Sequence, residues 1–494
     1  MGVPGSSALV PQLCDPHRST RRLRQWYLHI FSPSSLLLAD NYGYVPALVE
    51  AEPRLRLRYT QLVVAHLSHA HRLAAGFHSP PSMSRPFAAV QAAWRFYSNP
   101  RITLAQLAGP LIDCARTDVP IACAHWLPVI LDWSKLHLCG QDSRLDRVEM
   151  AHHKDLGYEL LTALAIGDRE GSPIAPLCLE LLAGGGVHST RSNDLLAPLS
   201  PLDSLGSVMA YVESLDLGKP AVFIIDREAD SVGHYRQWSA DGRRFLVRAN
   251  DPGRVRYEGR QQPLSQVADT LRRRNAFRNV RPVLIKGRPA YQFVAETTVV
   301  VDRPARTHRV DPRTGQLKHR NISGPPLSLR LVVSEVRDRR GKVLARWLLL
   351  TNLPPSVEAA TVALWYYWRW EIESYHKLLK GAGQQVEGWL QESAVTFSRR
   401  LLVAAMAGVI VWRLARENSP QAAEMRDVLV RLSGRQMKRG KNLRSFTEPA
   451  LLAGLGVLIS MLDYLRDHDL ADLRRLAEAV LPGLIRPDTR LEDG

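Results

Sequence analysis

Residues 221–230 read AVFIIDREAD, and this stretch decides the fold. Five apolar residues, Ala221 to Ile225, lead directly into Asp226. A short apolar run of this kind predicts a buried strand, here with a carboxylate at its end. The same pattern occurs upstream in residues 126–134, WLPVILDWS, where the apolar run leads into Asp132. We therefore expect two buried strands that each end in an aspartate.

The segments around these two runs complete the pattern. We expect strands within 158–166, 173–182 and 244–250, a helix over about 203–216, and a long helical stretch over about 356–380. This order of strands and helices is that of a ribonuclease H-like fold, an α/β fold with a mixed sheet. In open α/β sheets, ligands bind where strands end. Asp132 and Asp226 meet there only if their strands are neighbours.

The predicted helical stretch carries an unusual face. Residues 366–380 read YYWRWEIESYHKLLK. At about 100° per residue, Tyr366, Arg369, Glu373 and Lys380 fall within an arc of roughly 60°, and Lys377 lies close to it. One interpretation is a salt-bridged surface helix, in which Arg369 and Glu373 form an ordinary i,i+4 pair. The other is a functional face that joins a carboxylate to groups able to grip phosphate.

The chain is strongly basic, with a formal net charge of +17 over 494 residues. Residues 241–346 hold 25 Lys and Arg against 9 Asp and Glu, so this stretch contains nearly the whole excess. Its strand-like runs, rich in β-branched residues, predict a mostly β module with a basic face. A solvated surface is the alternative, but so large an excess favours contact with nucleic acid.

Other features narrow the classes of protein. The best apolar run near the C-terminus, residues 449–465, contains two glycines and ends near Asp463, so we expect a buried helix and no membrane span. The N-terminal residues contain no compact apolar core of the kind found in a signal peptide, so we expect no signal peptide. The five cysteines form no CxxC pair, which argues against a disulfide framework or a zinc site. We expect a cytoplasmic, nucleoid-associated protein.

Asp132, Asp226 and Glu373 suggest metal-dependent cleavage of phosphodiester bonds. Mg²⁺ prefers hard oxygen ligands, and two ions can activate the attacking group and stabilise the leaving oxygen. A single strand-end aspartate is more often a cap or turn residue. Two such residues with a helical glutamate, in a basic chain, predict catalytic carboxylates that bind two Mg²⁺ ions, with Mn²⁺ as a substitute.

The residues also resemble a known family. The spacing Y-x2-R-x3-E-x6-K, from Tyr366 to Lys380, is similar to the YREK signature of the insertion-sequence-four family of bacterial DDE transposases, nearest to its transposon-five type. DREAD at 226–230, LDWSKL at 131–136, AAWRFYSNPRIT at 92–103 and KGAGQQVE at 380–387 extend the likeness. The resemblance covers about residues 40–395.

The resemblance implies cut-and-paste DNA transposition. A homodimer would hold two terminal inverted repeats, nick one strand, form and open a hairpin, and join the end to target DNA. It further implies that Tyr366, Arg369 and Lys380 hold the DNA backbone around a flipped base. Trp347 would stack on that base, and Arg248 would lie near the hairpin. Stacking on an aromatic side chain is a sensible way to hold an extruded base.

The length indicates about three domains. We expect a helical DNA-binding domain over 1–112 and a ribonuclease H-like catalytic domain over 113–394, with a basic β-rich insertion at about 250–346. A helical domain over 395–494 would serve dimerisation or DNA contact. Two alternatives stay open: a ribonuclease H-like nuclease without strand transfer, and a catalytically inactive or domesticated DNA-binding relative. A tyrosine recombinase is disfavoured because its arginine and histidine cluster is not evident.

Overall fold

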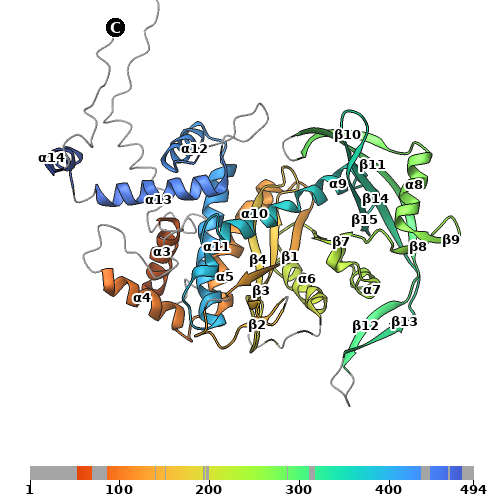
Figure 1. Cartoon of the computed structure of the whole chain (residues 1–494), viewed down its shortest axis with the longest axis horizontal. Coiled ribbons are helices and arrows are strands. Elements are labelled where there is room, and N and C mark those ends of the chain that lie inside the picture. Colours follow the sequence, from red (N-terminus) through yellow and green to blue (C-terminus); the bar gives the residue numbers. More distant parts are fainter. Residues whose placement is uncertain are drawn as a thin grey trace, which may run out of the picture.

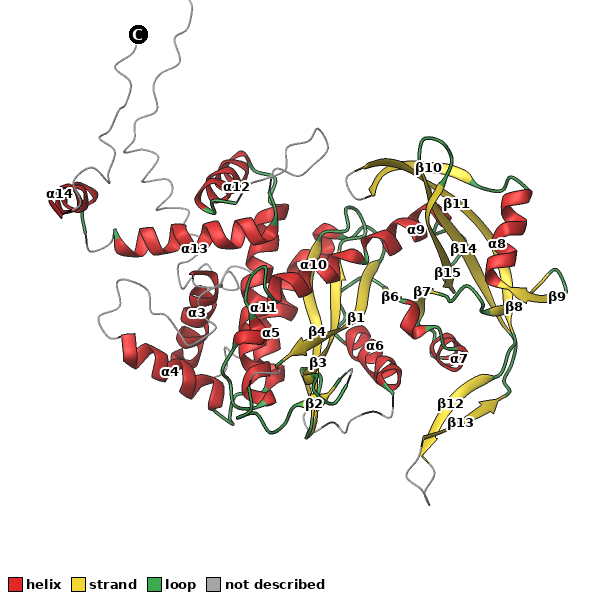
Figure 2. Ribbon diagram, viewed as in Figure 1, coloured by secondary structure: helices red, strands yellow, loops and turns green. Residues whose placement is uncertain are grey.

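The computed structural model describes residues 53–68, 86–138, 141–150, 152–192, 195, 198, 200–285, 288–310, 317–435, 446–465 and 468–480. Within them the chain is an α/β protein, in which a large mixed sheet lies between helices (Figures 1 and 2). The helices are α3 (Pro53–Ser68), α4 (Pro86–Ser98), α5 (Leu104–Ala122), α6 (Leu205–Ser214), α7 (Val232–Ala240), α8 (Leu264–Arg273), α9 (Ala359–Trp368), α10 (Trp370–Leu379), α11 (Ala394–Arg416), α12 (Pro420–Leu432), α13 (Glu448–Tyr464) and α14 (Leu470–Val480).

The main sheet of the described residues has thirteen strands, in the order β5-β4-β3-β1-β6-β7-β15-β14-β11-β8-β9, with β2 beside β3 and β10 beside β11. Strands β12 and β13 form a separate two-stranded sheet. The strands are β1 (Leu127–His137), β2 (Val148–Glu149), β3 (Leu156–Ile166), β4 (Pro173–Ala183), β5 (Gly186–Ser189), β6 (Ala221–Ile225), β7 (Arg244–Arg248), β8 (Arg254–Tyr257), β9 (Arg260–Pro263), β10 (Arg278–Ile285), β11 (Arg288–Val301), β12 (Ala305–Val310), β13 (Leu317–Ile322), β14 (Leu327–Arg337) and β15 (Val343–Thr351).

The centre of the sheet is confirmed as predicted. Strands β3, β4, β6 and β7 and helix α6 lie where the apolar runs placed them. Strand β1 pairs with β6 in parallel, and the last paired rung joins Leu131 to Ile225. The two strands that lead into Asp132 and Asp226 are therefore neighbours. The apolar runs Leu127–Leu131 and Ala221–Ile225 are almost continuously buried, as is typical of parallel strands covered on both faces.

Two predicted elements need correction. Strand β1 does not end at Asp132 but continues to His137, where it pairs with β3, so Asp132 lies within a strand. The predicted helical stretch 356–380 is two helices, α9 and α10, which meet at Arg369. The backbone N–H of Arg369 bonds to Tyr366, and that of Ile372 bonds to Arg369. These i,i+3 bonds tighten the chain locally and interrupt the regular α-helix.

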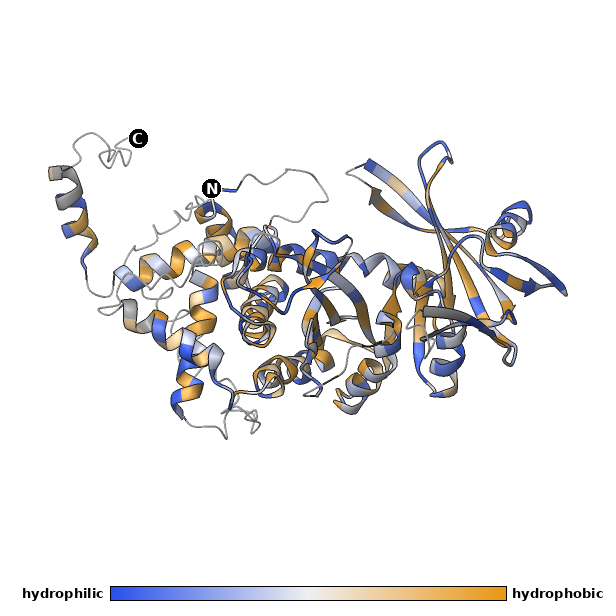
Figure 3. Ribbon diagram, turned by 60° about the horizontal axis from the view of Figure 1, so that its bottom comes forward, coloured by the Kyte–Doolittle hydropathy of each residue, from blue (hydrophilic) through white to orange (hydrophobic). Residues whose placement is uncertain are grey.

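The basic module of residues 250–346 extends the same sheet, through the antiparallel pairs β7–β15, β15–β14 and β14–β11. It also contains helix α8, which was not among the predicted elements. Figure 3 shows many blue, hydrophilic residues on this part of the molecule. Several of its arginines are used internally: Arg272, Arg337 and Arg346 all bind the buried carboxylate of Glu335.

Helices α5 and α11 pack against β4 near the other end of the sheet, and α3, α4 and α13 pack against α11. Helix α11 contacts β4, α5 and α3, and α13 is a buried helix as predicted. Within the described part of the chain, α11 is the one helix long and apolar enough to cross a membrane, but 83% of its most apolar window is buried inside the protein. The stretch HSPPSMSRP, residues 78–86, is rich in proline and serine and predicts a linker. Apart from Pro86 it lies outside the described residues, as does most of the basic stretch 433–446, SGRQMKRGKNLRSF, which is a candidate for DNA contact or a solvated loop.

Candidate active site

The two aspartates lie side by side at the edge where β6 ends. Asp132 follows Leu131 on β1, and Asp226 follows Ile225 on β6, so they occupy the rung directly after the last parallel pair. Each carboxylate accepts a bond from the backbone N–H of the next residue, at 2.9 Å for Trp133 and 2.6 Å for Arg227. Asp226 thereby caps the short 3₁₀ turn Arg227–Ala229. The N–H of the following residue thus orients one oxygen of each carboxylate.

Helix α10 brings the third carboxylate to this edge, and Arg369 joins all three. One guanidinium nitrogen lies 3.2 Å from Asp132, while the other lies 2.9 Å from Glu373 and 3.7 Å from Asp226. The side chain of Arg369 is 5% exposed, whereas the three carboxylates are 21–32% exposed. A buried positive charge therefore sits beneath three carboxylates that reach solvent.

Three further predicted residues lie around Asp226. The Tyr366 hydroxyl donates to Asp226 at 2.9 Å, and a guanidinium nitrogen of Arg248 lies 3.8 Å from the same carboxylate oxygen. Trp347 on β15 packs on Tyr366, with ring centroids 6.0 Å apart. The half-buried indole of Trp347 therefore contacts Tyr366, which in turn bonds to the carboxylate of Asp226.

The two predicted lysines are not part of this cluster. Lys380 lies just beyond the end of α10, where its ammonium binds the backbone carbonyl of Lys135 and lies 3.5 Å from Glu387. Lys377 is exposed. The structure therefore brings Tyr366, Arg369 and Glu373 together, as the predicted helix face requires. The ammonium of Lys380 instead lies against β1 at Lys135, away from the carboxylates. The reason is that the regular helix ends at Leu379.

The electrostatics differ between the two aspartates. Burial raises the pKa of Asp132 to about 6, although Arg369 opposes the shift. Burial also acts to raise the pKa of Asp226, but Arg369, the Arg227 N–H and the Tyr366 hydroxyl outweigh it, so this pKa is lowered. Burial and the neighbouring Asp226 raise the pKa of Tyr366, which keeps the phenol protonated. Two adjacent carboxylates with separated pKa values are typical of functional sites.

The donor set fits a hard cation by its chemistry. Carboxylate oxygens are the ligands that Mg²⁺ prefers, and Asp132, Asp226 and Glu373 supply them from three elements. Their three negative charges exceed the single charge of Arg369. Among the described residues, no group of three or more His, Cys, Asp or Glu side chains has the arrangement of a metal site. Coordination by all three carboxylates would require the Arg369 guanidinium to give way.

Two residues near the site were not singled out from the sequence. Trp370 is 49% exposed, and the Arg369 guanidinium lies 5.2 Å from its ring centroid. Asp230, the last residue of DREAD, accepts bonds from Asn250 N–H and from Arg303. An aromatic residue beside an arginine was a readable signal for Trp370. The role of Asp230 had no such signal, because its partner Arg303 lies 73 positions away in the sequence.

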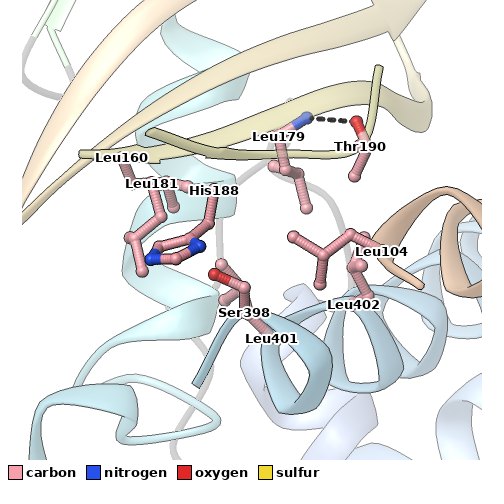
Figure 4. Close-up of a pocket in the computed structure, with 9 residues that line it drawn as sticks. All are labelled: Leu104, Leu160, Leu179, Leu181, His188, Thr190, Ser398, Leu401 and Leu402. Carbon is pink, nitrogen blue, oxygen red and sulfur yellow. Dashed lines mark hydrogen bonds between the residues drawn. The ribbon is translucent and has the colours of Figure 1, made fainter. Parts of the chain in front are cut away.

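A small cavity lies away from this site, between β4, α5 and α11. Figure 4 shows its lining, which is mostly leucine, with Thr190 bonded to the backbone of Leu179. Its volume of about 10 Å³ has room for about one water molecule. It is therefore a packing defect rather than a ligand site.

No protein-family model matches the sequence, and no curated protein is significantly similar to it.

Proposed function

We propose that this chain is a DDE-type DNA transposase that acts by cut-and-paste transposition. The observation that carries the proposal is the convergence of Asp132, Asp226 and Glu373 on one guanidinium, that of Arg369. The three acids come from β1, from the end of β6 and from α10. Parallel neighbours β1 and β6, flanked by antiparallel β3, support a ribonuclease H-like catalytic sheet.

Asp132, Asp226 and Glu373 would hold Mg²⁺. Bound there, the metal would supply positive charge that activates the attacking hydroxyl and stabilises the leaving oxygen. The protein's own groups position the substrate. Arg369 keeps the carboxylates together before DNA arrives. When the backbone enters, its guanidinium can turn to a phosphate, since arginine binds carboxylate and phosphate with the same planar donors.

Tyr366, Arg248 and Trp347 add phosphate-binding and base-stacking groups that simple phosphodiester cleavage does not need. The Tyr366 phenol stays protonated and can donate to a phosphate oxygen in place of Asp226. Arg248 is 31% exposed beside the same carboxylate and can bind an adjacent phosphate. The Trp347 ring offers a face on which an extruded base can stack. Together these side chains support hairpin formation at a transposon end.

The test is an assay with DNA that carries the element's own inverted ends, in Mg²⁺, with nicks, hairpins and joined strands resolved. The wild type is expected to give all three products. Asp226→Asn is expected to abolish them while leaving binding to the ends largely intact. Asp216→Asn is the control, because it makes the same change at an exposed turn with positive φ, which asparagine tolerates. Nicks without joined strands would support a nuclease instead.

A further inference from the structure

Thr162 is a buried polar residue that stands directly opposite Asp132. Thr162 lies on β3 and Asp132 on β1, and the two strands are antiparallel neighbours in the sheet (Figure 1). Residues directly opposite in such a ladder lie on the same face of the sheet, with Cβ atoms about 4.5–5.5 Å apart. A turn about its Cα–Cβ bond can therefore bring the Thr162 hydroxyl within reach of the Asp132 carboxylate.

The Thr162 hydroxyl has no hydrogen-bond partner in the described part of the chain. The residue is 0% exposed, so bulk water does not reach it either. A buried hydroxyl without a partner is destabilising, because it has lost its bonds to water. Such groups are rare in native proteins, and a catalytic role is one of the explanations for them. The place of this one, beside a candidate metal-binding carboxylate, points to that explanation.

Both oxygens of Asp132 already have donors. One accepts a bond from the backbone N–H of Trp133 at 2.9 Å, and the other accepts a bond from the guanidinium of Arg369 at 3.2 Å. The N–H belongs to the next residue on the same strand, so it stays with Asp132. The guanidinium has to give way before all three carboxylates can coordinate a metal. Asp132 then loses the donor on its second oxygen.

We propose that Thr162 is a positioning residue, whose hydroxyl donates to the second oxygen of Asp132 once Arg369 has left it. The inference rests on the proposed function, which requires the guanidinium to turn from the carboxylates to a phosphate. A hydroxyl suits this task because it brings no positive charge, so it orients the carboxylate without repelling a cation. Outer partners of this kind orient metal-binding groups, and their loss typically lowers metal affinity by about 10–100-fold.

The first test is thermal unfolding in EDTA at pH 8, with Thr162→Val made in the wild type and in Arg369→Gln. Valine has nearly the shape of threonine but no hydroxyl. In the wild type the substitution should leave the melting temperature unchanged or raise it, because the hydroxyl has no partner there. In Arg369→Gln it should lower the melting temperature, because the hydroxyl then bonds to Asp132. An equal change in both backgrounds would overturn the proposal.

Thr351→Val is the matched control. Thr351 is also 0% exposed on a strand of the same sheet, but its hydroxyl is already used. It donates to the carbonyl of Phe245 at 2.6 Å and accepts a bond from the N–H of Leu353 at 3.1 Å. Its removal leaves these two groups without their partner. Thr351→Val should therefore lower the melting temperature in both backgrounds by the same amount.

The second test measures Mn²⁺ binding to Arg369→Gln at pH 8, by electron paramagnetic resonance of the free ion. In this background no guanidinium has to be displaced. Adding Thr162→Val should weaken Mn²⁺ binding by about 10–100-fold. Adding Thr162→Ser, which keeps the hydroxyl, or Thr351→Val should leave it near the parent value.

The outcomes separate the two proposals. Unchanged Mn²⁺ affinity after Thr162→Val would overturn the role of Thr162 and leave the proposed function standing. An equal loss of affinity after Thr351→Val would overturn it as well, because the loss would then follow from any buried hydroxyl. No Mn²⁺ binding by the Arg369→Gln parent would refute the metal site of the three carboxylates, and with it the proposed function.

Discussion

Replacing Arg369 with Gln removes the charge that the three carboxylates share. The substitution keeps a planar polar side chain of similar size, so little packing is lost. Asp132, Asp226 and Glu373 would then repel one another at neutral pH, and the one nearby cation described above would be Arg248, 3.8 Å from Asp226. We expect the variant to be less stable than the wild type in EDTA, and most clearly so at high pH.

The size of the effect follows from the geometry. Opposite unit charges 4 Å apart attract by about 4 kcal/mol at an effective dielectric constant of about 20. Arg369 has such partners at 2.9, 3.2 and 3.7 Å. The cost of burying the guanidinium offsets much of this, and breaking a buried pair destabilises a protein by about 3–5 kcal/mol. Because the carboxylates are partly exposed, we expect about 3 kcal/mol, which is about 6–12 °C in melting temperature for a domain of 150–250 residues.

The assay is thermal unfolding of wild type, Arg369→Gln and Arg274→Gln in EDTA at pH 5 and pH 8. Arg274 is the matched control, because it pairs with Glu258 on the surface, where both side chains are more than half exposed. Its loss should change little. For Arg369→Gln the loss should be smaller at pH 5, where Asp132 is largely protonated. A variant as stable as the wild type at pH 8, or an equal loss at both pH values, would refute the reasoning.

Three further predictions follow from the same region. Asp132→Asn should be more stable than the wild type above about pH 6 in EDTA: burial raises the pKa of Asp132 to about 6, so wild-type stability falls as pH rises from about 4 through 6. A pH series of unfolding curves without that fall would contradict this. Trp347→Ala should impair hairpin formation more than the first nick in a product-resolved assay, and equal losses at both steps would count against stacking. Gly171→Ala should destabilise the protein by about 1–3 kcal/mol and so lower its melting temperature, because its φ is +72° and a Cβ atom would meet the Trp368 ring at 2.3 Å; Gly185→Ala, with nothing within 4 Å, is its control.

The sequence was sufficient to predict the centre of the fold because buried parallel strands are continuous apolar runs. It misplaced the end of β1 because the apolar run stops at Asp132 while the strand does not. The residues that follow, Ser134 to His137, alternate between buried and exposed, which is the period of a half-buried strand. That alternation was a usable signal for the longer strand.

Other features depend on contacts that one sequence does not reveal. No proline or glycine marks the break between α9 and α10 at Arg369. The break coincides with the bond from Arg369 to Asp132, a residue 237 positions away. The helical spacing correctly grouped Tyr366, Arg369 and Glu373. It also placed Lys380 on their face, but α10 ends at Leu379, one residue before Lys380. Helix α8, by contrast, has an amphipathic pattern that could have been recognised.

The central claim is that Asp132, Asp226 and Glu373 form one metal-dependent centre for DNA strand cleavage. The most direct measurement is the nicking rate on end-bearing DNA in Mg²⁺, for wild type, Glu373→Gln and Glu371→Gln. The two substitutions are the same change two positions apart in α10, and it is Glu373 that lies at the guanidinium of Arg369 with the two aspartates. We predict nicking by wild type and Glu371→Gln, and none by Glu373→Gln, with DNA binding kept in all three. Nicking by Glu373→Gln at the wild-type rate would contradict the account.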